Sequence, residues 1–272
     1  MTISGIITLV TDFGLKDPYV GMMKGAILSV NEGVQLVDIT HQVGAGSVFL
    51  AAGILRETFA FFPKGTVHLA VVDPGVGGPR RPIALEAGGH LFVGPDNGIF
   101  WPVIRDFNGK RIVHLTEKDY FLREPSFTFH GRDIFAPVAA HLSKGVGLEQ
   151  FGPLISDPRK LNIPAPLEKD DTLLGQIIRV DNFGNLITNI HAERLKRYLG
   201  EAQPLIEVGK LSIKGLSRAY SDLEEGQPLA LINSSNWLEI AVNMGRASQY
   251  IGMDREEIFG TVVKVKRAAT AI

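Results

Sequence analysis

Carboxylate residues stand directly after several apolar stretches in the first half of the chain. The three pairs are Thr66–Val72 before Asp73, Ile6–Thr11 before Asp12, and Val34–Val37 before Asp38. Apolar runs of this length, separated by helical stretches, are typical of buried parallel strands. In an open parallel sheet the ligand crevice lies just beyond the carboxyl ends of the strands. Each Asp taken singly is as typical of a helix or turn cap, but Asp12 and Asp73 together indicate a site at this edge.

The candidate partner of Asp73 is Arg80, which follows seven residues later across a turn rich in Gly and Pro. A guanidinium at this spacing can fold back onto the carboxylate, and charge-assisted hydrogen bonds would then orient it. An exposed turn ion pair that contributes little to stability is the alternative. Arg81 competes with Arg80 for the same role, and spacing alone does not separate them.

A histidine, His130, lies in the segment Phe127–Asp133, just before an expected helix. At such a position an imidazole can donate to an anion or orient a carboxylate. We expect Arg132 and Asp133, in the first helical turn, to be capping and surface residues. His68 lies within an apolar run and is expected to be structural.

Two polar segments in the second half are typical of turns. Asp181–Asn185 follows the apolar run Gln176–Val180, and Asn233–Asn236 separates two further apolar runs. Both patterns predict ordinary turns by default. In the functional alternative for the first segment, Phe183 stacks on a planar ring, Asn185 reads its edge and Asp181 takes a cation.

Composition and missing motifs exclude several classes of protein. The 272 residues carry a net charge of −1 and no basic tract, which disfavours a surface that follows nucleic-acid phosphates. The chain has no cysteine, so disulfides, thiolate metal sites and a cysteine nucleophile are excluded. We find no signal peptide, no apolar run of the ~20 residues that a membrane span needs, and no dinucleotide, phosphate-loop, metalloprotease or nucleophile-elbow motif. The histidines lack the spacing of metal ligands. We therefore expect a soluble, cytoplasmic protein without a metal site.

The order of expected elements predicts two domains. Residues 1–160 alternate strand and helix signals, with expected helices from Asp17-Pro18 towards Val30, from Ser47 to Phe61, and from about Gly131. This is the pattern of an α/β domain with a mainly parallel sheet. Residues 161–171 are expected to form a linker. Residues 172–272 are mostly short β-prone runs, which predict a small barrel or sandwich.

Six segments in this order resemble the S-adenosyl-L-methionine (SAM) hydroxide adenosyltransferase family, which is related to the bacterial fluorinase and chlorinase. They are Thr11–Gly21, Val71–Gly77 with Arg80, Gly94–Gly98, Thr128–Asp133, Val180–Asn185 and Asn233-Ser234. The resemblance spans almost the whole chain. It implies an N-terminal α/β domain, a C-terminal β-barrel, and a homotrimer whose sites lie between the N-domain of one subunit and the C-domain of its neighbour.

The reaction that the resemblance implies is attack of water-derived oxygen on the ribose C5′ of SAM, which gives adenosine and L-methionine without a cofactor. The implied catalytic triad, which holds and activates water, is Asp73, Arg80 and His130. The implied substrate contacts are Asp12 to the ribose hydroxyls, Phe129 and Phe183 as walls, Asn185 to adenine, Asp181 to the methionine ammonium, Ser234 to the methionine end, and Glu239 with the backbone near Val242 to complete the pocket.

Two other functions stay open at this point. A halide-using adenosyltransferase is disfavoured because those enzymes carry Tyr-Pro where this chain has Asp73-Pro74, and a carboxylate there would repel halide. A non-catalytic adenosine or SAM sensor would need the binding residues but not the triad. Finding both sets argues against a sensor.

Overall fold

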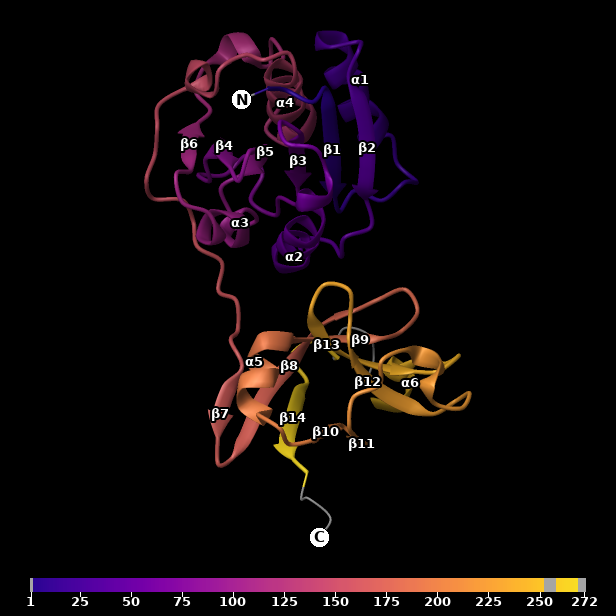
Figure 1. Ribbon diagram of the computed structural model, residues 1–272. Coiled ribbons are helices and arrows are strands. Elements are labelled where there is room, and N and C mark those ends of the chain that lie inside the picture. The colour runs from indigo at the N-terminus through magenta and orange to yellow at the C-terminus, as the bar shows by residue number, and fades with distance from the viewer. Residues whose placement is uncertain (1, 252–257, 269–272) are drawn as a thin grey trace. The chain divides into compact units, whose positions relative to one another are not determined.

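Two sheets, one mainly parallel and one antiparallel, organise the chain (Figure 1). The computed structural model describes residues 2–251 and 258–268. It divides into two compact units, Met1–Asn162 and Ile163–Ile272. Each unit builds its own apolar core.

The sheet of the first unit has the spatial order β2-β1-β3-β5-β4-β6. Its strands are β1 (Ile6–Thr11), β2 (Gln35–Thr40), β3 (Val67–Val71), β4 (Pro82–Ala87), β5 (His90–Pro95) and β6 (Arg111–His114). Neighbours among β2, β1, β3 and β5 pair in parallel, whereas β4 pairs antiparallel with both β5 and β6. The mainly parallel sheet predicted from the sequence is confirmed.

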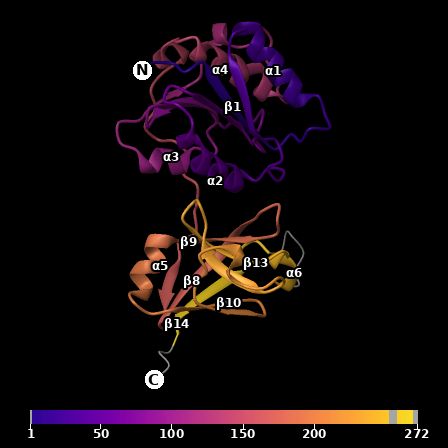
Figure 2. The same ribbon diagram turned by 45° about the vertical axis from the view of Figure 1, so that its right-hand side comes forward.

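Helices cover both faces of this sheet, as Figure 2 shows. Helices α1 (Tyr19–Val30) and α4 (Ala136–Ser143) pack together on one face, and α2 (Val48–Thr58) and α3 (Trp101–Asp106) on the other. The short helical turns are η1 (Phe59–Phe61), η2 (Lys118–Tyr120), η3 (Gly131–Phe135) and η4 (Leu148–Phe151). The helix expected from about Gly131 begins there, but its first turn, η3, is π-helical and not α-helical. Within the described part of the chain, no helix combines the length and apolar character needed to traverse a bilayer.

The second unit is an antiparallel sheet of order β11-β10-β14-β8-β9-β13-β12, with β7 added beside β8. Its strands are β7 (Leu167–Lys169), β8 (Thr172–Val180), β9 (Leu186–His191), β10 (Pro204–Val208), β11 (Leu211–Lys214), β12 (Pro228–Ile232), β13 (Trp237–Val242) and β14 (Val262–Arg267). Helices α5 (Ala192–Leu199) and α6 (Ala247–Ile251) and the turn η5 (Tyr220–Asp222) complete it. Because the end strands β11 and β12 contact each other, the sheet curls into a nearly closed barrel-like form around one apolar core. The barrel is thus confirmed, and β7 lies inside the segment 161–171 that the sequence predicts to be a linker.

A buried polar chain crosses the first sheet through His68 on β3. Its Nδ1 lies 2.8 Å from the Thr8 hydroxyl, and its Nε2 lies 3.2 Å from Nδ1 of His90. The ring is fully buried and stacks on Phe92 with 5.0 Å between ring centroids. Burial, followed by the nearby His90, lowers the pKa of His68 from 6.5 to about 3. His68 is therefore neutral in the folded protein and structural, as expected.

This depressed pKa predicts how the stability of the fold depends on pH. Since the unfolded chain takes up a proton on His68 below pH 6.5 and the folded chain does not, stability is complete above pH 6.5 and falls as the pH drops towards 3. The loss from this residue approaches ~1.4 kcal/mol per pH unit. Urea unfolding of the parent and of His68→Gln at pH 7 and pH 5 measures it. We expect the parent to lose more stability than the variant, and equal losses would contradict the assignment.

Candidate active site

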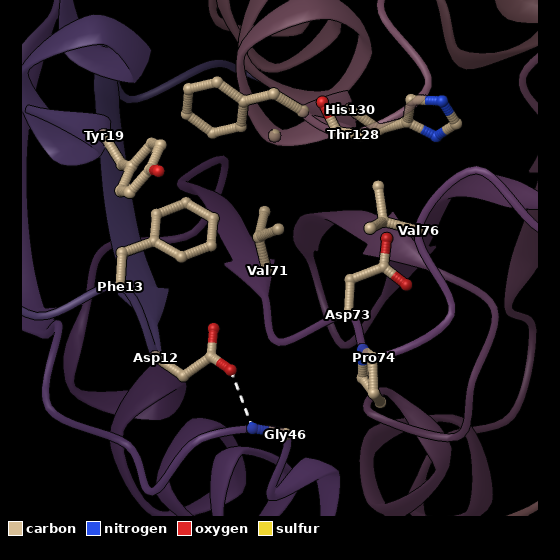
Figure 3. A pocket seen from close by; sticks show the side chains of 12 residues that line it. Asp12, Phe13, Tyr19, Gly46, Val71, Asp73, Pro74, Val76, Thr128 and His130 are labelled. Carbon is tan, nitrogen blue, oxygen red and sulfur yellow. Dashed lines mark hydrogen bonds between the residues drawn. The ribbon is translucent and has the colours of Figure 1, made fainter.

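A pocket of about 390 Å³ opens at the carboxyl ends of β1 and β3 (Figure 3). Its lining comes from four segments of the sequence: Asp12, Phe13 and Tyr19; Gly46; Val71, Asp73, Pro74 and Val76; and Thr128, Phe129, His130 and Gly131. Figure 3 shows Phe13 and Tyr19 along one side, Asp73 and His130 along the other, and Val71 between them. The structure therefore brings Asp12, Asp73, Phe129 and His130, all predicted from the sequence, into one pocket.

Three aromatic rings form the apolar wall. Phe13, Tyr19 and Phe129 meet edge to face, with ring centroids 5.3–6.0 Å apart. Each ring packs against the other two. Tyr19 remains 46% exposed. Such a wall suits a flat or apolar part of a ligand. Sequence reasoning assigned no role to Phe13 or Tyr19, although both lie within the segment Thr11–Gly21 that carries the resemblance.

Asp12 sits directly after β1, at the start of a tight turn. Its Oδ2 accepts a hydrogen bond from the backbone N–H of Gly46 at 2.8 Å. The hydroxyl of Thr11 accepts a hydrogen bond from the N–H of Phe13 at 3.3 Å. Hydrogen bonds of Thr11 and Asp12 therefore both stabilise this turn. One carboxylate oxygen of Asp12 is thereby anchored, and the group faces the pocket.

Asp73, Arg80 and His130 form a continuous hydrogen-bonded chain. Nε of Arg80 donates to both carboxylate oxygens of Asp73, at 3.0 and 2.9 Å, and Nη2 of Arg80 also donates to Oδ2. The same Nη2 lies 2.7 Å from Nδ1 of His130. The side chains of Arg80 and Asp73 are only 8% and 5% exposed. The guanidinium lies over the ring of Phe135, 5.2 Å from its centroid.

This arrangement assigns the tautomer of His130. A guanidinium carries only donors, so Nδ1 of His130 must accept, and the proton of the neutral ring resides on Nε2. Burial, followed by the positive charge of Arg80, lowers the pKa of His130, while Asp73 and Asp133 oppose that shift. The neutral ring is therefore favoured, and it presents an N–H donor. Nη1 of Arg80 is also buried and has no hydrogen-bond partner among the described residues, so the guanidinium keeps a free donor.

The competing arginine, Arg81, points elsewhere. Its guanidinium donates to the carboxylate of Asp96 at 3.0 and 2.7 Å and to Asp157 at 2.8 Å. Arg80, and not Arg81, is therefore the partner of Asp73.

The segment before His130 is held in place from behind by Asp133. This carboxylate is fully buried and accepts from the N–H and the hydroxyl of Ser126, at 2.8 and 2.7 Å, and from Arg132. Ser126 in turn accepts from the N–H of Phe129 at 3.1 Å. The expectation that Asp133 is a surface residue is wrong, because the chain folds back over the π-helical turn. That turn begins directly after His130, and such turns are frequent at functional sites.

The other sequence-predicted residues lie in the second unit. Asp181 and Asn185 are joined across the β8–β9 turn, with Asn185 donating from its backbone N–H and its side-chain amide at 2.8 and 3.0 Å. The turn predicted for this segment is confirmed. Phe183 at its tip is 73% exposed.

Around β13, the buried carboxylate of Glu239 accepts from the Tyr220 hydroxyl at 2.7 Å and the Asn233 amide at 3.1 Å. Burial, and then the bond to Glu239, raises the pKa of Tyr220. Ser234 is exposed beside Asn233, whereas Val242 is buried in the barrel core. Within the described ranges, no group of three or more His, Cys, Asp or Glu side chains has the geometry to hold a metal ion.

Comparisons with known proteins identify relatives of this chain. Residues 7–152 match the family model of the SAM hydroxide adenosyltransferase N-terminal domain, and residues 175–259 match that of the C-terminal domain. The (R)-S-adenosyl-L-methionine hydrolase of Salinispora tropica is 37% identical over 91% of this chain and 94% of its own length. A fluorinase of an Actinoplanes species is 28% identical to this chain, and the match covers 88% of this chain and 91% of the fluorinase. The crystal structure of an uncharacterized conserved protein from Thermotoga maritima superposes with a TM-score of 0.89 at 36% identity, covering 96% of this chain and all of that one.

Close backbone approach at Gly77 predicts a strong effect of a small substitution. Gly77 has φ +74°, and a Cβ there would lie 2.3 Å from the backbone oxygen of Phe127. Gly77→Ala must therefore push the Asp73–Arg80 loop away from the segment that leads to His130. We expect a loss of more than ~2 kcal/mol, since backbone strain and a clash add, measured as a drop in melting temperature.

Gly109 offers a matched control, because its φ is +70° but a Cβ there would meet nothing within 4 Å. Gly109→Ala carries only the left-handed strain of ~1–2 kcal/mol. If both variants melt at the same temperature, the close approach at Gly77 does not matter.

Proposed function

Because this chain belongs to the SAM hydroxide adenosyltransferase family, we propose that it hydrolyses S-adenosyl-L-methionine to adenosine and L-methionine. Water-derived oxygen forms a bond to the ribose C5′ while the C5′–S bond breaks. The sulfur keeps the electron pair and becomes the thioether of methionine, and one proton is released. No cofactor takes part in this proposal, since SAM is the substrate.

The observation that carries the proposal is the buried chain Asp73–Arg80–His130 at the edge of a pocket with an aromatic wall. A sulfonium is already a good leaving group, so no general acid is needed at sulfur. The protein must instead hold a water molecule in line and stabilise the negative charge that its oxygen gains when the water loses a proton, effects that together supply several kcal/mol. Arg80 and the Nε2–H of His130 are donors suited to a hydroxide-like oxygen.

The remaining roles follow from position and chemistry. Asp12, anchored through one oxygen to Gly46, would accept the ribose hydroxyls. Phe129 would wall the ligand in the pocket, together with Phe13 and Tyr19. In the second unit the expected contacts of Asp181, Phe183, Asn185, Ser234, Glu239 and Val242 stay predictions. A cytoplasmic location also stays a prediction.

Use of halide in place of water is disfavoured by charge. The carboxylate of Asp73 lines the pocket and its side chain is 5% exposed. A halide ~4 Å away would meet repulsion of several kcal/mol at an effective dielectric constant of about 20. Arg80 offsets part of this repulsion, but the same guanidinium would also stabilise a water-derived oxygen.

Incubation of the protein with SAM in oxygen-18 water tests the proposal. We expect equimolar adenosine and methionine, with one oxygen-18 atom at O5′ of adenosine by mass spectrometry, because solvent is the nucleophile. Substrate chirally deuterated at C5′ should react with inversion. Formation of 5′-chloro-5′-deoxyadenosine only when chloride is added, or binding of SAM without turnover, would contradict the proposal. Retention at C5′ would indicate a covalent intermediate.

We further propose that the protein acts as a homotrimer, with each site completed by the second unit of a neighbouring copy. Exposed apolar side chains support this, since Val76, which lines the pocket, is 36% exposed and Leu15 is 66% exposed. In the second unit, Phe183 and Met244 are 73% and 83% exposed. Exposed apolar side chains of this size are typical of surfaces that a partner covers.

Mixing two inactive variants tests the shared site. The first variant, Asp73→Asn, removes a charge from the first unit. The second variant, Asp181→Ala with Asn185→Ala, removes two expected substrate contacts from the second unit. Each variant alone should lose ~10²-fold or more in turnover. If copies share sites and exchange at random in equal amounts, about a quarter of the sites regain both intact halves. The control is the same mixture without subunit exchange. No recovery after proven exchange would place the whole site in one chain.

A further inference from the structure

The loop that carries Asp73 and Arg80 crosses the end of strand β5. In the sheet, β5 lies between β3, which precedes the loop, and β4, which follows it. Because β3 runs parallel to β5 and β4 runs antiparallel to it, the end of β3, the end of β5 and the start of β4 fall at one edge. The two residues directly after β5, Asp96 and Asn97, therefore lie between the two ends of the loop.

Asn97 holds the first end. Its side-chain amide donates to the backbone oxygen of Val72 at 2.8 Å, one residue before Asp73. Its own side-chain oxygen accepts from the N–H of Ile99 at 3.2 Å, which fixes the orientation of the amide.

Asp96 holds the second end. Its backbone N–H donates to the oxygen of Arg81 at 2.9 Å, one residue after Arg80, and its buried carboxylate accepts twice from the Arg81 guanidinium. The other carboxylate oxygen accepts from the N–H of Arg159 at 2.7 Å. Asp96 is thus fixed on both sides.

The backbone of the loop has few constraints of its own apart from the Asp73–Arg80 ion pair. It contains Gly75, Gly77 and Gly78, and glycine gives a chain more conformational freedom than any other residue. Inside the loop, backbone bonds run from the N–H of Val76 to Asp73 at 3.2 Å and from that of Gly78 to Gly75 at 3.1 Å. Fixing the two ends limits where Asp73 and Arg80 can meet.

We infer that Asp96 and Asn97 are positioning residues: by fixing both ends of the loop, they set the alignment of the Asp73–Arg80–His130 chain. The importance of this alignment for turnover rests on the proposed function, but the alignment itself does not. A displacement of ~1 Å in such a chain is enough to lower a rate by ~10²-fold.

The test compares Asn97→Ala with a matched control, Asp157→Ala. The control removes an ion pair to Arg81 on the solvent side, where the Asp157 side chain is 76% exposed, and leaves both ends of the loop held. Three quantities are measured well below the melting temperature: kcat and KM for SAM, and the pKa of His130 by NMR titration of its ring, with the signal assigned through His130→Gln.

For Asn97→Ala we expect kcat to fall ~10-fold or more with KM changed less than ~3-fold, because alignment and not binding is lost. The pKa of His130 should rise, because Arg80, whose charge lowers it, is held less closely. Asp157→Ala should match the parent in kcat, KM and the pKa of His130. Asp96→Asn, which weakens the other end, should change kcat and the pKa of His130 in the same direction as Asn97→Ala, and it replaces Asn97→Ala if that variant does not fold.

A lower melting temperature with kcat and the pKa of His130 both unchanged would show a merely structural role and overturn the inference. Equal effects of Asp157→Ala and Asn97→Ala would overturn it as well. The NMR titration does not depend on any substrate. If the parent fails to hydrolyse SAM, the proposed function fails, and the change in His130 alone decides the inference.

Discussion

The buried positive charge of Arg80 is the interaction on which the rest of the first unit depends. Its side chain is 8% exposed, and an uncompensated charge at such a depth destabilises a fold by ~3–5 kcal/mol. Compensation comes from both carboxylate oxygens of Asp73, from the imidazole of His130 and from the face of the Phe135 ring. These partners come from two distant segments, so the loop after β3 and the π-helical turn before α4 must meet. The close contact at Gly77 makes that meeting possible.

The same charge also decides the chemistry that the pocket offers. Since Arg80 occupies Nδ1 of His130, the neutral ring holds its proton on Nε2 and acts as a donor, not as a base. A site built from a guanidinium and an imidazole N–H stabilises an oxygen that is gaining negative charge. In the proposed reaction these two donors would hold and stabilise the nucleophile, and displacement of a sulfonium requires no acid at the leaving group. Water as the nucleophile agrees with this electrostatic arrangement.

Apolar runs that end on Asp12 and Asp73 predicted the mainly parallel sheet and placed both carboxylates at one sheet edge, and short β-prone runs predicted the barrel. His130 was predicted from its place before a helix and Phe129 only from the resemblance, while the sequence missed Phe13 and Tyr19. It did not separate Arg80 from Arg81. That choice depends on Asp96, which reaches Arg81 only because β5 lies between β3 and β4. It also misjudged Asp133, whose burial depends on a fold-back of the chain through Ser126. Periodicity reports which face of an element is apolar, and it says nothing about polar side chains that are buried by tertiary contacts.

The tautomer of His130 tests this account most directly. The ring nitrogens of the protein labelled with nitrogen-15 in histidine, assigned with His130→Gln, report protonation at each position by their chemical shifts. At neutral pH we expect an unprotonated Nδ1 and a protonated Nε2, with the neutral ring as the dominant form. A proton on Nδ1, in either the neutral or the charged ring, would contradict it, because Arg80 could not then donate to His130.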